Sequence, residues 1–317
     1  MEIRSWCLSD KPSLRELLEI QERFGLPSPA LVEKDWYLVK ALAAISAADA
    51  GPFRLVFGGG TALSRAHGLI RRMSEDIDLK IVAGTKPSRP ELGRLRESIT
   101  AALLGAGFEF APTNPAHRRS MYENRYTLYQ LPYQPIAEGQ GALRPEIQIE
   151  TSLWPMRRPP VALPVISYIA EGFGRPPELA AIDCAAIVES AAEKLVALTR
   201  RYGAALADAG RMPDPTLVRH VYDLHVIREH YDPAEVAVLA LEIMPDDAEI
   251  YGRQFAAYRD NPLAETQRAI KAIAADADFA SGYANFLRDM VYGDSPDFET
   301  AIATLKTLAK HLEKGNA

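Results

Sequence analysis

Residues 53–82 constrain the fold of this chain more than any other segment. Residues 53–57 (FRLVF) predict a short strand that ends at the glycine triplet 58–60. Residues 61–69 then predict a short helix that stops near Gly68. After a basic turn, residues 74–82 (SEDIDLKIV) alternate charged with apolar side chains, the pattern of a half-buried strand. A strand, a glycine turn, a helix and a second strand therefore follow one another within a short stretch.

The rest of the chain separates into a mixed region and a helical region. Further helices are predicted at 12–24, 29–45 and 88–105, and further strands at 108–111, 122–131 and 144–152. Only helices are predicted later, at 183–201, 215–230, 233–243, 247–258, 263–274, 279–291 and 297–314. The Pro-rich stretch 155–177 is interpreted as the junction. We therefore expect an α+β domain over 1–170, with a mixed and mostly antiparallel sheet, and a helical domain over 171–317.

The composition is that of a globular protein. The 317 residues are 48% apolar and 25% charged, and 36 basic against 42 acidic side chains give a net charge of −6. This balance argues against a protein that coats nucleic acid without specificity, which needs a basic excess. It leaves room for a local basic face, since arginines occur in pairs. The pairs, each interpreted first as solvated surface, are 71–72, 118–119, 157–158 and 200–201.

Neither a membrane span nor a secretory signal is predicted. The chain has no run of 18 apolar residues, and its first residues lack an apolar segment behind basic ones. Its two cysteines, Cys7 and Cys184, are too far apart in sequence for a metal-binding or redox motif. We therefore expect a reduced, cytoplasmic protein, and a monomer.

The segment 57–80 combines groups suited to phosphate and to a divalent cation. The glycine triplet lets backbone N–H groups approach a phosphate closely, and Thr61 and Ser64 offer hydroxyls nearby. Asp76 and Asp78 share one strand face, where two carboxylates repel unless a cation lies between them. Mg²⁺ suits such a pair because it accepts one or two protein carboxylates together with phosphate oxygens and water. The combination indicates nucleotidyl transfer.

Several motifs carry a family resemblance. Residues 57–64 (FGGGTALS) and 72–79 (RMSEDIDL) resemble the glycine and DxD motifs of DNA polymerase β-like nucleotidyltransferases. In detail they resemble the AbiEii toxins of bacterial type IV toxin–antitoxin and abortive-infection systems, which include mycobacterial toxins that add nucleotides to tRNA. Three further stretches, in the same order as in that family, agree: residues 33–39 (EKDWYLV), 192–198 (AEKLVAL) and 219–224 (RHVYDL).

The resemblance implies a set of site residues. Asp76 and Asp78 would bind Mg²⁺, Lys194 would contact the nucleotide phosphates, and Asp223 would act as a base or orient a catalytic group. A third carboxylate is expected on a later strand, where Glu146 and Glu150 share one face and the family wording favours Glu150. The expected nucleotide-binding residues are Gly58, Gly59, Gly60, Thr61, Ser64, Ser74 and Lys194.

Simpler interpretations stand beside these roles. Ser74 also fits a residue that caps the turn before the strand, and Lys194 fits a solvated helix lysine. Asp223 lies four residues after Arg219, so the two can form a helical ion pair.

Three functions follow from this site. The first is an Mg²⁺-dependent toxin that transfers nucleotides from an NTP to RNA, above all to the tRNA 3′ acceptor end, with the arginine pairs 71–72 and 200–201 holding RNA phosphates. The second is the same chemistry on a protein or small-molecule hydroxyl, as in adenylylation. The third is a scaffold that binds nucleotide without turnover, against which the presence of both Asp76 and Asp78 argues. The antitoxin partner implied by the family need not contact the toxin.

Overall fold

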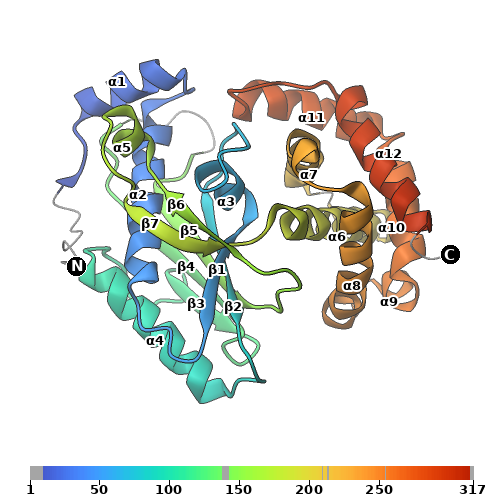
Figure 1. Ribbon diagram of the computed structural model, residues 1–317, viewed down its shortest axis with the longest axis horizontal. Helices are drawn as coiled ribbons and strands as arrows, with labels where there is room; N and C mark the ends of the chain where they lie inside the picture. The colour runs from blue at the N-terminus through green and yellow to red at the C-terminus, as the bar shows by residue number, and fades with distance from the viewer. Residues whose placement is uncertain (1–9, 138–142, 209, 213, 254, 315–317) are drawn as a thin grey trace. The chain divides into compact units, whose positions relative to one another are not determined.

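The computed structural model describes residues 10–137, 143–208, 210–212, 214–253 and 255–314 (Figure 1). The chain divides into two compact units, each treated by itself below. The first contains residues 1–68 and 73–185, and the second contains residues 69–72 and 186–317. This boundary lies further along the chain than the division drawn at 170/171 from the sequence. Cys7 lies outside the described residues, whereas Cys184 is buried at the end of the first unit.

The first unit is a seven-stranded mixed sheet with helices. Its strands run in the order β3-β4-β5-β2-β1-β7-β6. The β2–β5 and β1–β7 pairs are parallel and the other four are antiparallel, so the α+β prediction with a mostly antiparallel sheet is confirmed. The strands are β1 (Arg54–Gly58), β2 (Asp76–Val82), β3 (Arg118–Met121), β4 (Tyr126–Pro132), β5 (Glu146–Leu153), β6 (Val161–Val165) and β7 (Leu179–Cys184). The helices are α1 (Leu14–Phe24), α2 (Pro29–Ser46), α3 (Gly59–Arg65), α4 (Arg89–Gly105) and α5 (Tyr168–Gly172).

The two faces of this sheet differ in chemistry. Ile77, Leu79 and Ile149 are at most 1% exposed on one face, and α2 contacts β2, β5 and α4. Because side chains alternate along a strand, the other face of β2 and β5 carries Asp76, Asp78, Gln148 and Glu150. All four are half-buried. The alternation predicted from the sequence thus separates an apolar face from a polar one.

Two sequence-based assignments in this unit are wrong. Residues 108–111 form no strand: Phe108 and Phe110 are buried against the rings of Tyr37 and Tyr129, and β3 takes the edge of the sheet instead. The Pro-rich stretch 155–177 contains β6 and α5 rather than a plain junction. Pro164 is tolerated because β6 is an edge strand, where one side of the backbone forms no ladder.

The second unit is helical. It contains α6 (Ile187–Ala207), α7 (Val218–Val226), α8 (Pro233–Tyr251), α9 (Ala256–Asp260), α10 (Pro262–Ile273), α11 (Ala277–Met290) and α12 (Phe298–Lys314), with 3-10 turns η2 (Pro215–Leu217) and η3 (Arg228–His230) around α7. The helices predicted at 233–243 and 247–258 differ most from the structure, because α8 continues through Pro245 to residue 251. Among the described helices, none is long and apolar enough to cross a membrane.

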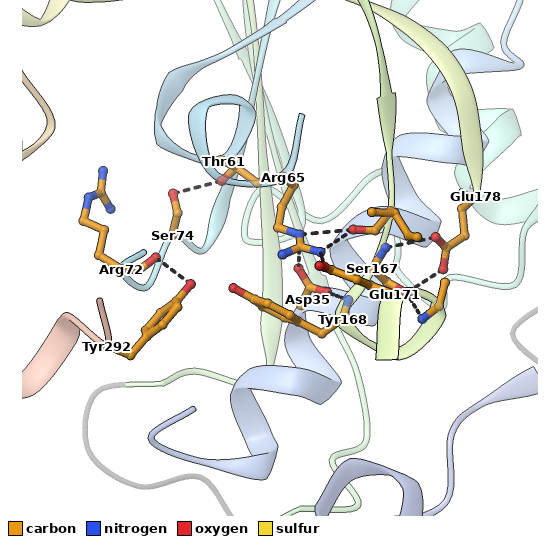
Figure 2. A network of polar contacts seen from close by, with 12 residues as sticks. Asp35, Thr61, Arg65, Arg72, Ser74, Ser167, Tyr168, Glu171, Glu178 and Tyr292 are labelled. Carbon is orange, nitrogen blue, oxygen red and sulfur yellow. Dashed lines mark hydrogen bonds and ion pairs between the residues drawn. The ribbon is translucent and has the colours of Figure 1, made fainter. Parts of the chain in front are cut away.

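A short segment from the first half of the sequence belongs to the second unit. Residues 69–72 lie between α3 and β2 in the chain. Arg72 forms an isolated antiparallel bridge with Val291, and the Tyr292 N–H donates to the Arg71 carbonyl at 3.1 Å. The Tyr292 hydroxyl also donates to the Arg72 carbonyl at 3.4 Å (Figure 2). The basic turn is therefore anchored by its backbone.

Candidate active site

The glycine turn packs directly against one carboxylate of the polar face. β1 ends at Gly58, which lies opposite Asp78 in the antiparallel β1–β2 pair, and α3 begins at Gly59. Gly59 has φ +70°, a left-handed backbone conformation that residues other than glycine rarely adopt. A Cβ atom at residue 59 would lie 1.8 Å from the Asp78 Oδ2 atom. The close approach of this backbone to Asp78 therefore requires glycine.

Three carboxylates gather on the polar face. Asp76 and Asp78 are two residues apart on β2, so both project from the same side. In the parallel β2–β5 pair, Asp78 lies opposite Glu150. Glu146 is on the same face of β5 but precedes Gln148, the partner of Asp76, and lies opposite Pro132 of β4. Of the two candidates for a third carboxylate, Glu150 is thus the direct neighbour of Asp78.

Two polar side chains lie close to Glu150. The Gln148 Nε2 atom donates to Glu150 Oε1 at 2.9 Å. Tyr126 of β4 lies close enough to Glu150 that the charge of this carboxylate, after burial, raises the pKa of the Tyr126 phenol. Exposed Arg119 of β3 acts on Tyr126 in the opposite sense. The hydrogen bond from Gln148 orients the Glu150 carboxylate.

This donor set fits Mg²⁺ that also binds substrate. Mg²⁺ in phosphoryl-transfer enzymes usually takes one or two carboxylates and completes its shell with phosphate oxygens and water. Asp76 and Asp78 provide such a pair on one half-buried face. Within the described ranges, no group of three or more His, Cys, Asp or Glu side chains is arranged to hold a metal by itself. Any metal here would accordingly need the Asp76–Asp78 pair together with substrate oxygens.

The hydroxyls expected to bind phosphate have different surroundings. Thr61 is 1% exposed, and its hydroxyl donates to the Asp76 carbonyl at 2.5 Å and lies 2.9 Å from Ser74 Oγ (Figure 2). Thr61 therefore ties α3 to the start of β2. Ser64 is buried one helical turn later, whereas Ser74 is half-buried just before the strand.

In the second unit, Asp223 of α7 lies between two cations. Its side chain is 0% exposed and accepts from Arg72 Nε at 2.6 Å, from an Arg72 terminal N–H at 2.7 Å, and from Lys194 Nζ of α6 at 2.7 Å. Burial opposes the charge of Asp223, but Arg72 and Lys194 outweigh it and hold the pKa of this carboxyl far below its usual range. An unprotonated carboxylate with both oxygens engaged is a poor proton acceptor. The geometry favours the orienting role for Asp223 over the role of base.

The arginine pairs expected to hold RNA are largely engaged within the protein. Arg72 is 4% exposed and bound to Asp223, so the interpretation of this residue as solvated surface is wrong. Arg200 pairs with Asp247 at 2.7 Å and lies over the Tyr251 ring, and Arg201 pairs with Asp214. Arg71 is exposed.

The sequence reasoning missed three residues of these networks. Gln148 and Tyr126 share the face of Glu150, and the alternation of β4 and β5 would have placed them there once the strand pairing was known. Arg72 stands in the motif RMSEDIDL but was taken as half of a surface pair. Its partner, Asp223, is 151 residues away, and no local pattern connects the two.

The comparisons with known proteins identify the family and the fold of the chain. A family model described as "Nucleotidyl transferase AbiEii toxin, Type IV TA system" matches residues 40–304. The chain belongs to this family of nucleotidyltransferase toxins. Among solved structures, it is similar to MenT4, a nucleotidyltransferase toxin from Mycobacterium tuberculosis H37Rv, with a TM-score of 0.59 and 19% identity over 94% of this chain and 89% of that one. That likeness shows a shared fold. A comparison with curated protein sequences finds no significant match.

Proposed function

We propose that the protein is an Mg²⁺-dependent toxin that transfers nucleotides from an NTP to RNA, with the tRNA 3′ end as acceptor. The observation that carries this proposal is the contact between the glycine turn and the carboxylate face, above all Gly59 against Asp78. A phosphate chain beside this backbone would have metal-binding carboxylates within reach. The family match supports the nucleotidyltransferase class, while the metal and the acceptor are our assignments.

In the proposed reaction, an acceptor hydroxyl oxygen bonds to the α-phosphorus of the NTP, pyrophosphate leaves, and the hydroxyl proton passes to solvent. Backbone N–H groups of Gly58, Gly59 and Gly60 orient the phosphates. Asp76 and Asp78 hold Mg²⁺, which when bound there neutralises charge on the triphosphate and the leaving group. Glu150, oriented by the hydrogen bond from Gln148, serves as the third carboxylate.

The second unit contributes a cation and its support. A lysine has three N–H donors, and Lys194 gives one to Asp223. We assign its remaining donors to nucleotide phosphate, and we assign Asp223 the task of orienting Lys194 and Arg72. Ser64 and Ser74 remain assigned to phosphate contact, with Thr61 acting through the backbone of Asp76.

An RNA acceptor is supported by a basic side chain on the same sheet: Arg119 of β3 lies opposite Leu128 of β4, which lies opposite Glu150. Arg119 is exposed and near enough to Tyr126 for its charge to act on that phenol. Such a side chain suits an RNA phosphate. A protein or small-molecule hydroxyl is the second candidate acceptor. A reaction on NTP and tRNA belongs in the cytoplasm, and we expect a monomer without obligatory contact to its antitoxin.

A labelling assay tests the proposal. Purified protein and Mg²⁺ are incubated with each α-³²P-labelled NTP in turn, with total tRNA or a protein extract as acceptor, and with the Asp76→Ala variant in parallel. We expect label on tRNA with one nucleotide and none with the variant. Label on protein alone would move the assignment to adenylylation. No label on any acceptor would contradict nucleotidyl transfer.

A further inference from the structure

Three consecutive charged residues lie in a helix that is buried on all sides. Nearly every residue of α2 is buried, including Glu33, Lys34 and Asp35, which are at most 8% exposed. Consecutive residues of an α-helix point about 100° apart, so the three side chains leave α2 in three directions. Because a buried charge is costly unless it is paired, each must find a partner on a different segment.

Lys34 reaches the start of the metal-binding strand. Its Nζ atom lies 2.5 Å from Glu75 Oε2 and donates to the Arg144 carbonyl at 3.1 Å. Glu75 immediately precedes Asp76, and its side chain is 20% exposed against 6% for Lys34. The ion pair therefore fixes the residue next to a candidate metal ligand and the residues that lead into β5.

Asp35 reaches the helix that follows the glycine turn. Its carboxylate forms an ion pair with Arg65 of α3, at 3.1 Å from Nε, and accepts from the Tyr168 N–H at 2.7 Å (Figure 2). Arg65 lies over the Tyr168 ring at 3.9 Å, bonds the Ile166 carbonyl and lies 3.3 Å from Glu171. The far end of α3 is thus held by a buried ion pair, while Thr61 ties its first turn to β2.

Glu33 takes the third direction. Its carboxylate accepts from the Ile136 N–H at 2.9 Å and from the Ala137 N–H at 3.0 Å, and Lys11 lies 3.1 Å from it. Ile136 and Ala137 follow β4 in the chain. One turn of α2 thereby anchors the segment after β4, the segment before β2, and α3.

We infer that residues 33–35 form the positioning element of the candidate active site, with Lys34 and Asp35 setting where the carboxylates and the glycine turn lie relative to each other. This inference rests on the proposed function, because it assumes that these segments bind Mg²⁺ and NTP. None of the three residues touches the reacting groups in this role. Residues that orient metal ligands through hydrogen bonds typically contribute about 10- to 100-fold to affinity or activity.

The experiment compares Lys34→Met, Glu75→Gln and the double variant with a matched control. The control is Arg118→Met, which removes another largely buried cation of the first unit. Arg118 ties β3 to Glu97 and Thr100 of α4. Two readouts are taken for each protein. Mg²⁺-dependent NTP binding is measured by calorimetry, and backbone hydrogen–deuterium exchange is measured over residues 59–65 and 73–79.

We expect Lys34→Met and Glu75→Gln each to weaken NTP binding about 10-fold or more and to speed exchange over 73–79. The double variant should be no worse than either, because both changes remove one interaction. Lys34→Arg should restore most of the binding. Arg118→Met should change exchange around α4 and leave NTP affinity within about twofold.

Two results would overturn the inference. One is wild-type exchange over 73–79 in Lys34→Met, and the other is faster exchange with unchanged NTP affinity, which would make the ion pair purely structural. A wild-type protein that binds no NTP would instead contradict the proposed function. Exchange over 73–79 at the wild-type rate in Lys34→Met would then still refute the anchoring, and faster exchange would support it.

Discussion

Asp78 on β2 and Asp223 on α7 are both carboxylates expected at the site, yet their surroundings differ sharply. Asp78 is half-buried on a strand face that it shares with Asp76 and Glu150, against the backbone of Gly59. Asp223 is 0% exposed, and Arg72 and Lys194 occupy both of its oxygens. Several carboxylates gathered on the face of Asp78 favour the binding of a divalent cation, whereas Arg72 and Lys194 neutralise the charge of Asp223. The surroundings of Asp78 suit ligand binding, and those of Asp223 suit a structural role.

A third carboxylate extends this comparison. Asp35 is buried like Asp223, at 8% against 0% exposed, but it faces one cation, Arg65, and lies near Glu171 and Glu178. Burial therefore prevails and raises the pKa of Asp35 to about 6, whereas the pKa of Asp223 is lowered. The balance of nearby charges, rather than burial alone, decides the direction.

The largest expected effect is on stability, at Asp223. Asp223→Asn leaves two buried cations without their counter-charge and should cost about 3–5 kcal/mol of unfolding free energy. The measurement is urea denaturation at pH 7, with Asp214→Asn, whose partner Arg201 is 38% exposed, as the control expected to lose less than about 1 kcal/mol. Because the pKa of Asp223 is lowered on folding, its stabilisation should be complete above about pH 4 and decrease below it. A loss at Asp223 no larger than at Asp214 would refute the supporting role.

The second effect is on activity, at Asp78. Asp78→Ala should reduce Mg²⁺-dependent NTP turnover about 100-fold or more and leave the melting temperature nearly unchanged, because Asp78 lies half-buried on the polar face of the sheet and outside the apolar core. The control is Asp183→Ala, a carboxylate on β7 of the same sheet, which should retain turnover. A large fall in melting temperature would mean that Asp78 is structural, and the contrast with Asp223 would fail.

A smaller effect is expected from Gly59→Ala. The new methyl group would overlap Asp78 Oδ2, and φ +70° would cost about 1–3 kcal/mol. We expect NTP binding to weaken about 10-fold, at the lower end of the range for disturbed ligand positions, as measured by calorimetry. Gly93→Ala in α4, where the added Cβ meets only Asn124 at 3.6 Å, should bind NTP normally. Equal behaviour of the two variants would contradict the close approach at Gly59.

The smallest effect is a pH dependence from Asp35. A carboxyl whose pKa rises to about 6 on folding is favoured in its protonated form, so its contribution to stability decreases as pH rises from about 4 to 6. Relative to Asp35→Asn, the wild type should lose about 1 kcal/mol between pH 5 and pH 7.5. Urea midpoints of both proteins at these two pH values test this, with Arg65, Glu171 and Glu178 left intact. If the wild type instead gains stability relative to Asp35→Asn as the pH rises, the charge of Arg65 outweighs the effect of burial on the Asp35 pKa.

The sequence predicted the local parts of this structure better than its long-range pairs. The alternation of residues 74–82 and the glycine triplet sufficed for β1, α3 and β2, because strand and turn preferences are local. The strand predicted at 108–111 was wrong because apolar side chains pack against aromatic rings as readily as they form a strand. Arg72–Asp223 and Lys34–Glu75 join residues far apart in the chain, so only the fold shows that these charges are paired.

The most direct test of the central claim is a crystal structure of the protein with a non-hydrolysable NTP and Mn²⁺, with the metal located by its anomalous scattering. The account predicts a metal peak coordinated by Asp76 and Asp78, and a phosphate chain against the backbone of residues 58–61. An ordered nucleotide and metal bound elsewhere, with these two carboxylates and the glycine turn unoccupied, would contradict it.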